Sequence, residues 1–284
     1  MKLHEPRTPT IDAHHHFWRY SREEYGWIDD SMAEIRRDFL PPDLRIETQI
    51  AGMDGVVSVQ ARQSLEETRW LLDLAQNNSF IRGVVGWAPL IDPAAPRLLE
   101  ELRSSNPKLR SVRHVLQGEP DERYMLRDDF NRGLAALLSL GLAYDILIHE
   151  RQLPAAIELV DRHPDQVFVL DHIGKPRIRD LAIEPWRKNM RELARRPNVY
   201  CKLSGMSTEA GPGLWTEAQL RAYFQMTLDV FGPSRLMFGS DWPVCIPTCS
   251  YARWMNLVLC WIDRLTPREQ ARILGGTAIE AYGL

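Results

Sequence analysis

Residues 10–18 read TIDAHHHFW, a short apolar run that ends in three histidines and two aromatic residues. Thr10 and Ile11 are β-branched, and such residues favour strands. Side chains two residues apart on a strand share a face, so His14 and His16 project to the same side. The stretch therefore predicts a strand whose end presents two imidazoles together, which is a common way to offer ligands to a metal ion or donors to an oxyanion.

Seven further apolar runs of strand length follow, and helical periodicity fills most of the intervals between them. The predicted strands are residues 10–14, 55–60, 83–87, 109–113, 143–148, 167–170, 198–203 and 235–238. The predicted helices are residues 65–75, 94–104, 129–140, 152–162, 186–195, 217–231, 251–263 and 267–278. Eight strands alternating with helices indicate an α/β fold with a parallel sheet closed into a (β/α)8 TIM barrel. An open doubly wound sheet is the alternative, but the chain lacks that fold's glycine fingerprint.

Composition narrows the class of protein and of partner. The 284 residues carry a formal net charge of −3, which gives no electrostatic basis for binding nucleic acid or an anionic membrane. We expect one barrel domain over residues 1–284, with no transmembrane helix and no signal peptide. The four cysteines form no C-x-x-C pair, so we expect reduced thiols and a cytoplasmic protein. The sequence does not determine the oligomeric state.

Active sites of such barrels lie at the C-terminal ends of the strands, where this chain gathers its polar residues. The candidates at these ends are His14, His16, Arg62, Arg113, His149, His172, Lys202 and Asp241. A carboxylate after a buried strand, such as Asp241, either pairs with a cation or accepts a proton from water. His172 has a structural alternative, a hydrogen bond to Asp171. His149 is equally consistent with a ligand and with a structural residue.

Three cationic side chains are candidates for binding a polar substrate. Arg62 and Arg113 offer planar, paired donors to carboxylate or carbonyl oxygens. Each is equally consistent with an internal ion pair. Lys202 is consistent with polarising a carbonyl and equally with a structural salt bridge.

The nine tryptophans are the one unusual entry in the composition. Four of them, Trp18, Trp27, Trp87 and Trp242, lie near the predicted strand ends or in the long segment after the first strand. Indole faces pack well against the C–H face of a sugar ring, so we expect these four to wall the site. The alternative is that all nine are packing residues.

Several motifs together resemble the amidohydrolase superfamily, in its amidohydrolase-related branch. The matching stretches are IDAHHHFW (11–18), FVLDHIGKP (168–176), CKLSGM (201–206) and FGSDWP (238–243). They are spread from the first strand to the eighth, so the resemblance covers nearly the whole chain. Within the branch the chain is most similar to sugar lactonases of the L-fucono-lactonase and L-rhamnono-lactonase type. The resemblance implies the same barrel that the strand count predicts.

The resemblance also implies roles for individual residues. His14 and His16 match the metal-binding pair of the first strand, His172 matches the histidine of the sixth, and Asp241 matches the general base of the eighth. His149 lies near the position of a further ligand. Two-metal members carry a bridging lysine or glutamate after the fourth strand, where this chain has Arg113, which argues against a binuclear centre. A single divalent ion, zinc first, is the expected cofactor, although some members of the branch hydrolyse lactones without a metal.

The expected function is hydrolysis of a small-molecule sugar lactone, with Asp241 activating water. Three alternatives stay open at this point: a metal-dependent decarboxylase of a small carboxylic acid, a hydrolase of non-sugar lactones, and a non-catalytic binder of sugar acids. The sequence does not determine the stereochemistry of the lactone or its ring size.

Overall fold

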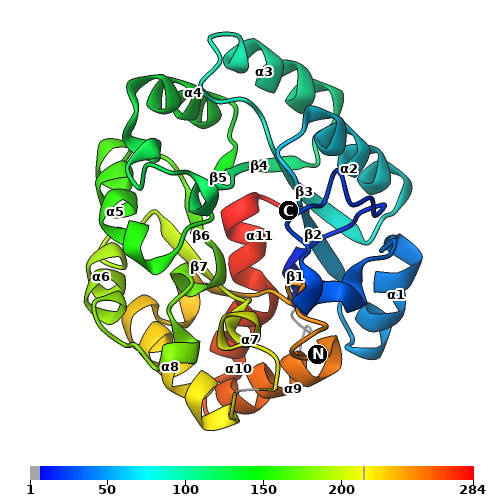
Figure 1. The fold of residues 1–284 in the computed structure, drawn as a ribbon, viewed down its shortest axis with the longest axis vertical. Coiled ribbons are helices and arrows are strands. Elements are labelled where there is room, and N and C mark those ends of the chain that lie inside the picture. The colour runs from blue at the N-terminus through cyan, green and yellow to red at the C-terminus, as the bar shows by residue number, and fades with distance from the viewer. Residues whose placement is uncertain (1–6, 214) are drawn as a thin grey trace, which may run out of the picture.

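Eight parallel strands lie side by side in chain order in the computed structural model, which describes residues 7–213 and 215–284. They form the ring in Figure 1. Their bounds are β1 (Ile11–His15), β2 (Gly55–Val59), β3 (Ile81–Gly86), β4 (Leu109–His114), β5 (Ala143–Ile146), β6 (Phe168–Leu170), β7 (Val199–Leu203) and β8 (Leu236–Phe238). The sequential order confirms the predicted barrel and excludes the open doubly wound sheet, whose strand order reverses.

The barrel closes where the end of β1 meets the segment after β8. The N–H of His16 donates to the carbonyl of Trp242 at 2.7 Å, and the N–H of Asp241 donates to the carbonyl of His14 at 2.8 Å. Closure therefore places residues that are far apart in the chain at one point of the rim, beside each other.

Amphipathic helices cover the outside of the barrel (Figure 1). In the described residues the helices on the outside are α1 (Pro41–Ile50), α2 (Leu65–Asn77), α3 (Ala95–Ser105), α4 (Asp128–Ser139), α5 (Leu153–Arg162), α6 (Trp186–Leu193), α8 (Glu217–Phe231), α9 (Tyr251–Ile262) and α10 (Pro267–Ala271), whereas α7 (Met206–Ala210) and α11 (Thr277–Tyr282) lie at the two ends of the barrel. In the same residues, no helix combines the length and the apolar character that a membrane span needs.

The predicted helix over residues 267–278 is divided in the structure. A π-helical turn, Arg272–Gly276, separates α10 from α11. A Cβ on Gly275 would lie 1.9 Å from the carbonyl oxygen of Pro9, so only glycine permits this close approach of the two segments. The short helices α1 and α7 were not predicted.

The last helix, α11, fills the N-terminal end of the barrel, and Figure 1 shows it inside the ring of strands. Ala278, Ala281 and Tyr282 of α11 pack in one buried cluster with Ile11 and Ala143, the first residues of β1 and β5. Only the opposite end of the barrel, where the strands have their C-termini, is left for a site.

Candidate active site

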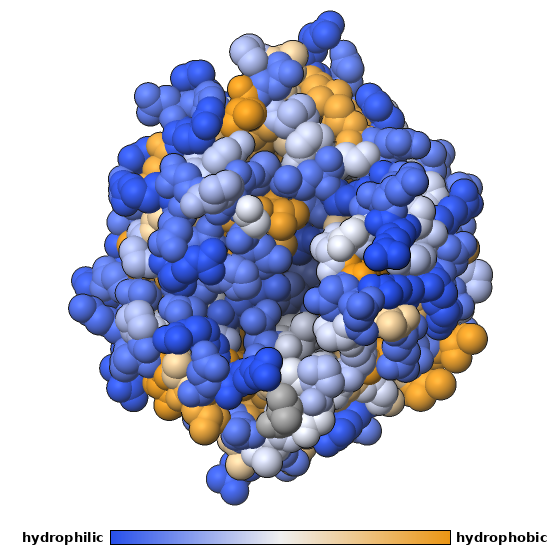
Figure 2. Space-filling model, in the orientation of Figure 1, coloured by the Kyte–Doolittle hydropathy of each residue, from blue (hydrophilic) through white to orange (hydrophobic). Residues whose placement is uncertain are grey.

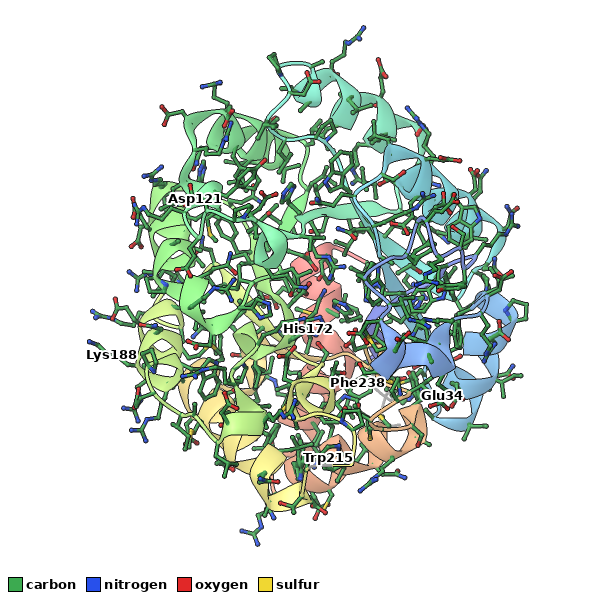
Figure 3. All side chains as sticks on the ribbon, viewed as in Figure 1. Glu34, Asp121, His172, Lys188, Trp215 and Phe238 are labelled. Carbon is green, nitrogen blue, oxygen red and sulfur yellow. The ribbon has the colours of Figure 1, made fainter. Side chains whose placement is uncertain are left out.

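Four of the predicted site residues meet at the C-terminal ends of β1, β6 and β8. One ligand atom from each of His14, His172 and Asp241 lies within 4.8 Å of the others. The Nε2 atom of His16 lies 3.2 Å from Nε2 of His14 and 3.4 Å from Oδ1 of Asp241. All four side chains are buried, and Figure 3 shows His172 near the barrel axis. The four side chains therefore form one compact cluster at the C-terminal end of the barrel.

The backbone at this cluster has an uncommon conformation. His172 has φ 53° and Asp241 has φ 59°, which lie in the left-handed region that side chains other than glycine rarely adopt. Each such residue costs about 1–3 kcal/mol and persists only where its surroundings hold it, most often at functional sites. Gly205 provides room for one of them, because a Cβ there would lie 2.6 Å from Nδ1 of His172.

Outer hydrogen bonds orient two of the imidazoles. Nδ1 of His16 lies 2.9 Å from the carbonyl oxygen of Val59. A carbonyl only accepts, so Nδ1 of His16 carries a proton and donates it to Val59, which fixes the orientation of the ring. Nδ1 of His172 lies 2.8 Å from Oγ of Ser204, a hydroxyl that can donate or accept.

His14 has two partners on its outer side. Its Nδ1 lies 3.1 Å from Nζ of Lys202 and 3.3 Å from Oδ1 of Asp171. If Nδ1 of His14 accepts a hydrogen bond from Lys202, the imidazole proton is on Nε2. If Nδ1 instead donates to Asp171, Nε2 keeps a lone pair. Among the described residues, Oδ1 of Asp171 receives no hydrogen bond of acceptable geometry. The protein therefore holds an acceptor ready for the second tautomer.

A buried ion cluster lies behind His14. Nζ of Lys202 lies 2.5 Å from Oδ2 of Asp145 and 2.8 Å from Oδ1 of Asp171. Arg113 lies 2.9 Å from the other oxygen of Asp171, and the hydroxyl of Tyr282 donates to Asp145 at 2.8 Å. Two cations and two carboxylates balance, which is the condition under which buried charges are tolerated.

Burial and nearby charges keep His14 and His172 neutral and the Asp241 carboxylate ionised. Burial, assisted by the charge of Lys202, holds the pKa of His14 well below its usual value. Burial likewise lowers the pKa of His172 to about 4. Burial alone would raise the pKa of Asp241, but the neighbouring His172 and His16 outweigh burial and lower it. At neutral pH the cluster therefore combines the neutral imidazoles of His14 and His172 with the negatively charged carboxylate of Asp241.

This donor set fits one divalent metal ion. Imidazole nitrogens with a carboxylate are ligands that Zn²⁺ prefers, and ligating histidines usually donate their other N–H to a protein oxygen. His16 does so to Val59, and His14 has Oδ1 of Asp171 at 3.3 Å for the same purpose. The residues that would hold the ion are His14, His172 and Asp241, with His16 adjacent.

Above the cluster lies a cavity of about 380 Å³, large enough for a small sugar derivative. Figure 2 shows the hollow near the centre of this face, among mainly hydrophilic residues. His16, His172 and Asp241 line its floor, and Arg62 and Arg113 line its wall. A wider hollow of about 720 Å³ lies near Tyr200 and Arg235, at the N-terminal ends of β7 and β8, and has none of the site residues in its lining.

The structure corrects the expectation of four indoles around the site. Only Trp27, 40% exposed, lines the cavity; Trp18, Trp87 and Trp242 do not. The indole of Trp18 is fully buried and donates to the carbonyl of Arg37 at 2.9 Å. Trp242 is also buried and packs edge-to-face on an aromatic ring of the segment after β1. Both indoles therefore pack in the protein interior and do not line the cavity.

Lys202 and His149 also differ from their expected roles. Lys202 is fully buried in the ion cluster behind His14 and does not reach the cavity, so the salt-bridge alternative holds. His149 follows the last residue of β5, Ile146, by three positions, and its imidazole is not among the converging ligand atoms. Arg62 and Arg113 line the cavity as predicted, but Arg62 pairs with Glu24 at 2.6 Å and Arg113 pairs with Asp171.

Sequence reasoning missed several residues at the site. Asp171 supports His14, Gln117 and Thr208 line the cavity, and Lys175 pairs with Glu209 across it at 3.3 Å. The signal for Asp171 and Lys175 was present, because both lie in the motif that contains His172. Gln117, Thr208 and Glu209 lie on loops and short helices whose positions no pattern indicates.

Comparison with known proteins gives this geometry a family. The sequence profile of the family described as Amidohydrolase matches residues 11–284. The chain belongs to this amidohydrolase family. The resemblance expected from the motifs is thereby confirmed for nearly the whole length of the chain.

Two curated relatives of this amidohydrolase share most of its length. The L-fucono-1,5-lactonase of Burkholderia multivorans is 42% identical, with 96% of each chain covered. The L-fucono-1,5-lactonase of Burkholderia ambifaria is 38% identical, with 96% of this chain and 94% of the relative covered. Among solved structures, a Burkholderia multivorans amidohydrolase with bound zinc superimposes with a TM-score of 0.94 at 42% identity, covering 97% of this chain and 99% of the other.

Proposed function

We propose that this amidohydrolase hydrolyses the ester bond of sugar lactones, aldonolactones such as L-fuconolactone, to the corresponding sugar acids. The observation that carries the proposal is the ionised Asp241 held among neutral imidazoles at the floor of a polar cavity of about 380 Å³. The two lactonase relatives support the same reaction class.

In the proposed mechanism Asp241 acts as general base. A water molecule beside its carboxylate attacks the lactone carbonyl carbon while Asp241 takes up the proton. The tetrahedral intermediate collapses by breaking the ring C–O bond, and Asp241 returns the proton to the leaving ring oxygen. The product is a hydroxy acid, which loses its proton at neutral pH.

The histidines orient this chemistry. In the metal-free site, with Ser204 donating to Nδ1 of His172, the Nε2–H of that imidazole would donate to the developing oxyanion; with a metal bound, His172 would instead be one of the ligands. His16, fixed by Val59, positions Asp241 from the other side at 3.4 Å. A bound divalent ion, for which we propose zinc, would act as a Lewis acid and lower the pKa of water at the cluster.

The cavity wall would hold the rest of the substrate. Trp27 offers an indole face at the rim, and the guanidinium groups of Arg62 and Arg113 each have an Nε atom without a hydrogen-bond partner in the described residues. We propose that the two guanidinium groups donate to lactone or hydroxyl oxygens.

The competing reaction, decarboxylation of a small carboxylic acid, has less support. It needs a free cation to hold the substrate carboxylate, and both arginines of the cavity already pair with protein carboxylates, Glu24 and Asp171.

The test is a panel of aldono-1,4- and 1,5-lactones assayed by acid release, with and without chelator, with metal content measured on the same sample. The proposal expects turnover of at least one lactone and its loss in Asp241→Asn. Glu158→Asn, at an exposed ion pair far from the cavity, is the matched control. No activity across the panel, or wild-type turnover in Asp241→Asn, would overturn the proposal.

We also propose that residues 1–284 form a single domain in a cytoplasmic protein. The family profile runs through one continuous barrel, and the cysteines are free, as they are in a reducing compartment.

A further inference from the structure

Each cationic side chain that lines the cavity in the described residues carries its own carboxylate partner. Arg113 pairs with Asp171 at 2.9 Å, and Arg62 pairs with Glu24 at 2.6 Å. The third pair, Lys175 and Glu209, has an N–O distance of 3.3 Å. The three pairs cancel, so no cationic side chain of the cavity lining is free to pair with a ligand.

The Lys175–Glu209 pair is the one whose two members both line the cavity. Lys175 follows His172 by three residues and has a left-handed backbone, φ 46°. Its positive charge lies close enough to contribute to lowering the pKa of both His172 and Asp241. Glu209 lies on α7, and the two side chains are only 16% and 20% exposed.

A ligand with a carboxylate would bind unfavourably in such a cavity. It would lose its hydration and find no side-chain cation that is free to pair with it. A like charge placed opposite a buried charge is a common means of rejecting a wrong ligand. A ligand without charge loses far less on entering.

Two further polar side chains of the cavity lining suit hydroxyl groups. Among the described residues, Oε1 of Gln117 and Oγ1 of Thr208 are buried and have no hydrogen-bond partner, although both residues line the cavity. An amide oxygen accepts a hydrogen bond, and a hydroxyl donates or accepts one. A polyhydroxylated ligand would satisfy both atoms, whereas an apolar ligand would leave them unpaired at a cost.

We propose that the Lys175–Glu209 pair is a specificity-determining element that restricts the cavity to uncharged, hydroxyl-bearing lactones, whose hydroxyls bind Gln117 and Thr208. The proposal rests on the proposed lactonase function and deepens it. Glu209 is the decisive member, because its removal leaves Lys175 as a free cation beside the reacting centre. The same neutrality favours release of the product, which leaves as an anion.

The experiment compares two lactones that differ in one group: an aldonolactone, and the aldaric acid monolactone that has a carboxylate in place of the terminal CH₂OH. Wild type is expected to prefer the uncharged lactone in kcat/KM. In Glu209→Gln, kcat/KM for the acidic lactone should rise by about tenfold or more, as measured for charge pairs in other binding sites. The double variant Lys175→Met/Glu209→Gln should lose that gain, and Glu158→Gln should leave the preference as in wild type.

A binding measurement separates this inference from the lactonase function. Titration calorimetry with an aldarate dianion should show tighter binding to Glu209→Gln than to wild type, and weaker binding again in the double variant. If wild type hydrolyses no lactone but aldarate binding follows this order, the lactonase proposal fails and the charge selection stands. Equal use of the two lactones by wild type, or no gain for the acidic ligand in Glu209→Gln by either readout, overturns the inference.

Discussion

Replacing Gly205 by alanine should displace His172, although no proposed catalytic side chain is itself substituted. An added Cβ would lie 2.6 Å from Nδ1 of His172, whereas an ordinary contact begins at 3.4 Å. The imidazole must therefore move by about 0.8 Å, the difference between these distances. Misplacement of a reacting group by about 1 Å costs on the order of 10²-fold in rate, so kcat for the lactone should fall roughly 100-fold.

The left-handed backbone of Gly205 adds a separate cost, which a control can remove from the comparison. Alanine in this region costs about 1–2 kcal/mol of stability. Gly141 has nearly the same φ, 63° against 67°, and a Cβ there would meet nothing within 4 Å. Gly141→Ala should therefore lose similar stability and keep its kcat.

The assay pairs steady-state lactone hydrolysis with urea unfolding of both variants. Near-wild-type kcat in Gly205→Ala, or an equal loss of kcat in Gly141→Ala, would refute the reasoning that the glycine provides room for His172.

Three further outcomes can be checked. Lys202→Met leaves buried Asp145 without its cation and Asp171 with Arg113 alone, and it should cost about 3–5 kcal/mol in urea unfolding. Met at exposed Lys188, which Figure 3 shows at the periphery, should cost almost nothing, and similar losses in the two variants would contradict the ion cluster. The pKa of His172 is about 4 in the folded protein against an ordinary value of 6.5, so the unfolded chain binds more protons between these two pH values. The free energy of unfolding should therefore fall by up to about 3 kcal/mol as the pH drops from 6.5 to 4. His172→Asn should lack this component, and a pH dependence identical to that of wild type would rule the shift out. Zinc at about a hundredfold excess over its Kd should stabilise the protein by about 2.7 kcal/mol in thermal unfolding, and His14→Gln should lose most of that gain; an undiminished gain would place the metal elsewhere.

The sequence was sufficient for the barrel and for the residues at its floor because both depend on local order. A strand's apolar run and the polar residue that ends it are adjacent in the chain, and parallel closure brings such ends together whatever the loops do. His14, His16, His172 and Asp241 all follow this rule.

The residues that were misjudged depend on contacts across the barrel. The indole of Trp18 packs in the protein interior because the segment before α1 folds over it. Lys202 lies behind His14 because β5 and β7 carry Asp145 and Lys202, and Asp171 directly follows β6, which lies between them. No linear pattern records which of several cations finds which carboxylate.

The helix that fills the barrel has a consequence for how the enzyme is made. Tyr282 of α11 donates to Asp145, which pairs with Lys202, which in turn contacts His14 near the start of the chain. During synthesis, Tyr282 must therefore be added to the chain before the contacts that support His14 are complete. A nascent or proteolysed chain that lacks α11 retains every proposed catalytic side chain and still lacks the foundation of the site, so activity reports on integrity of the whole chain.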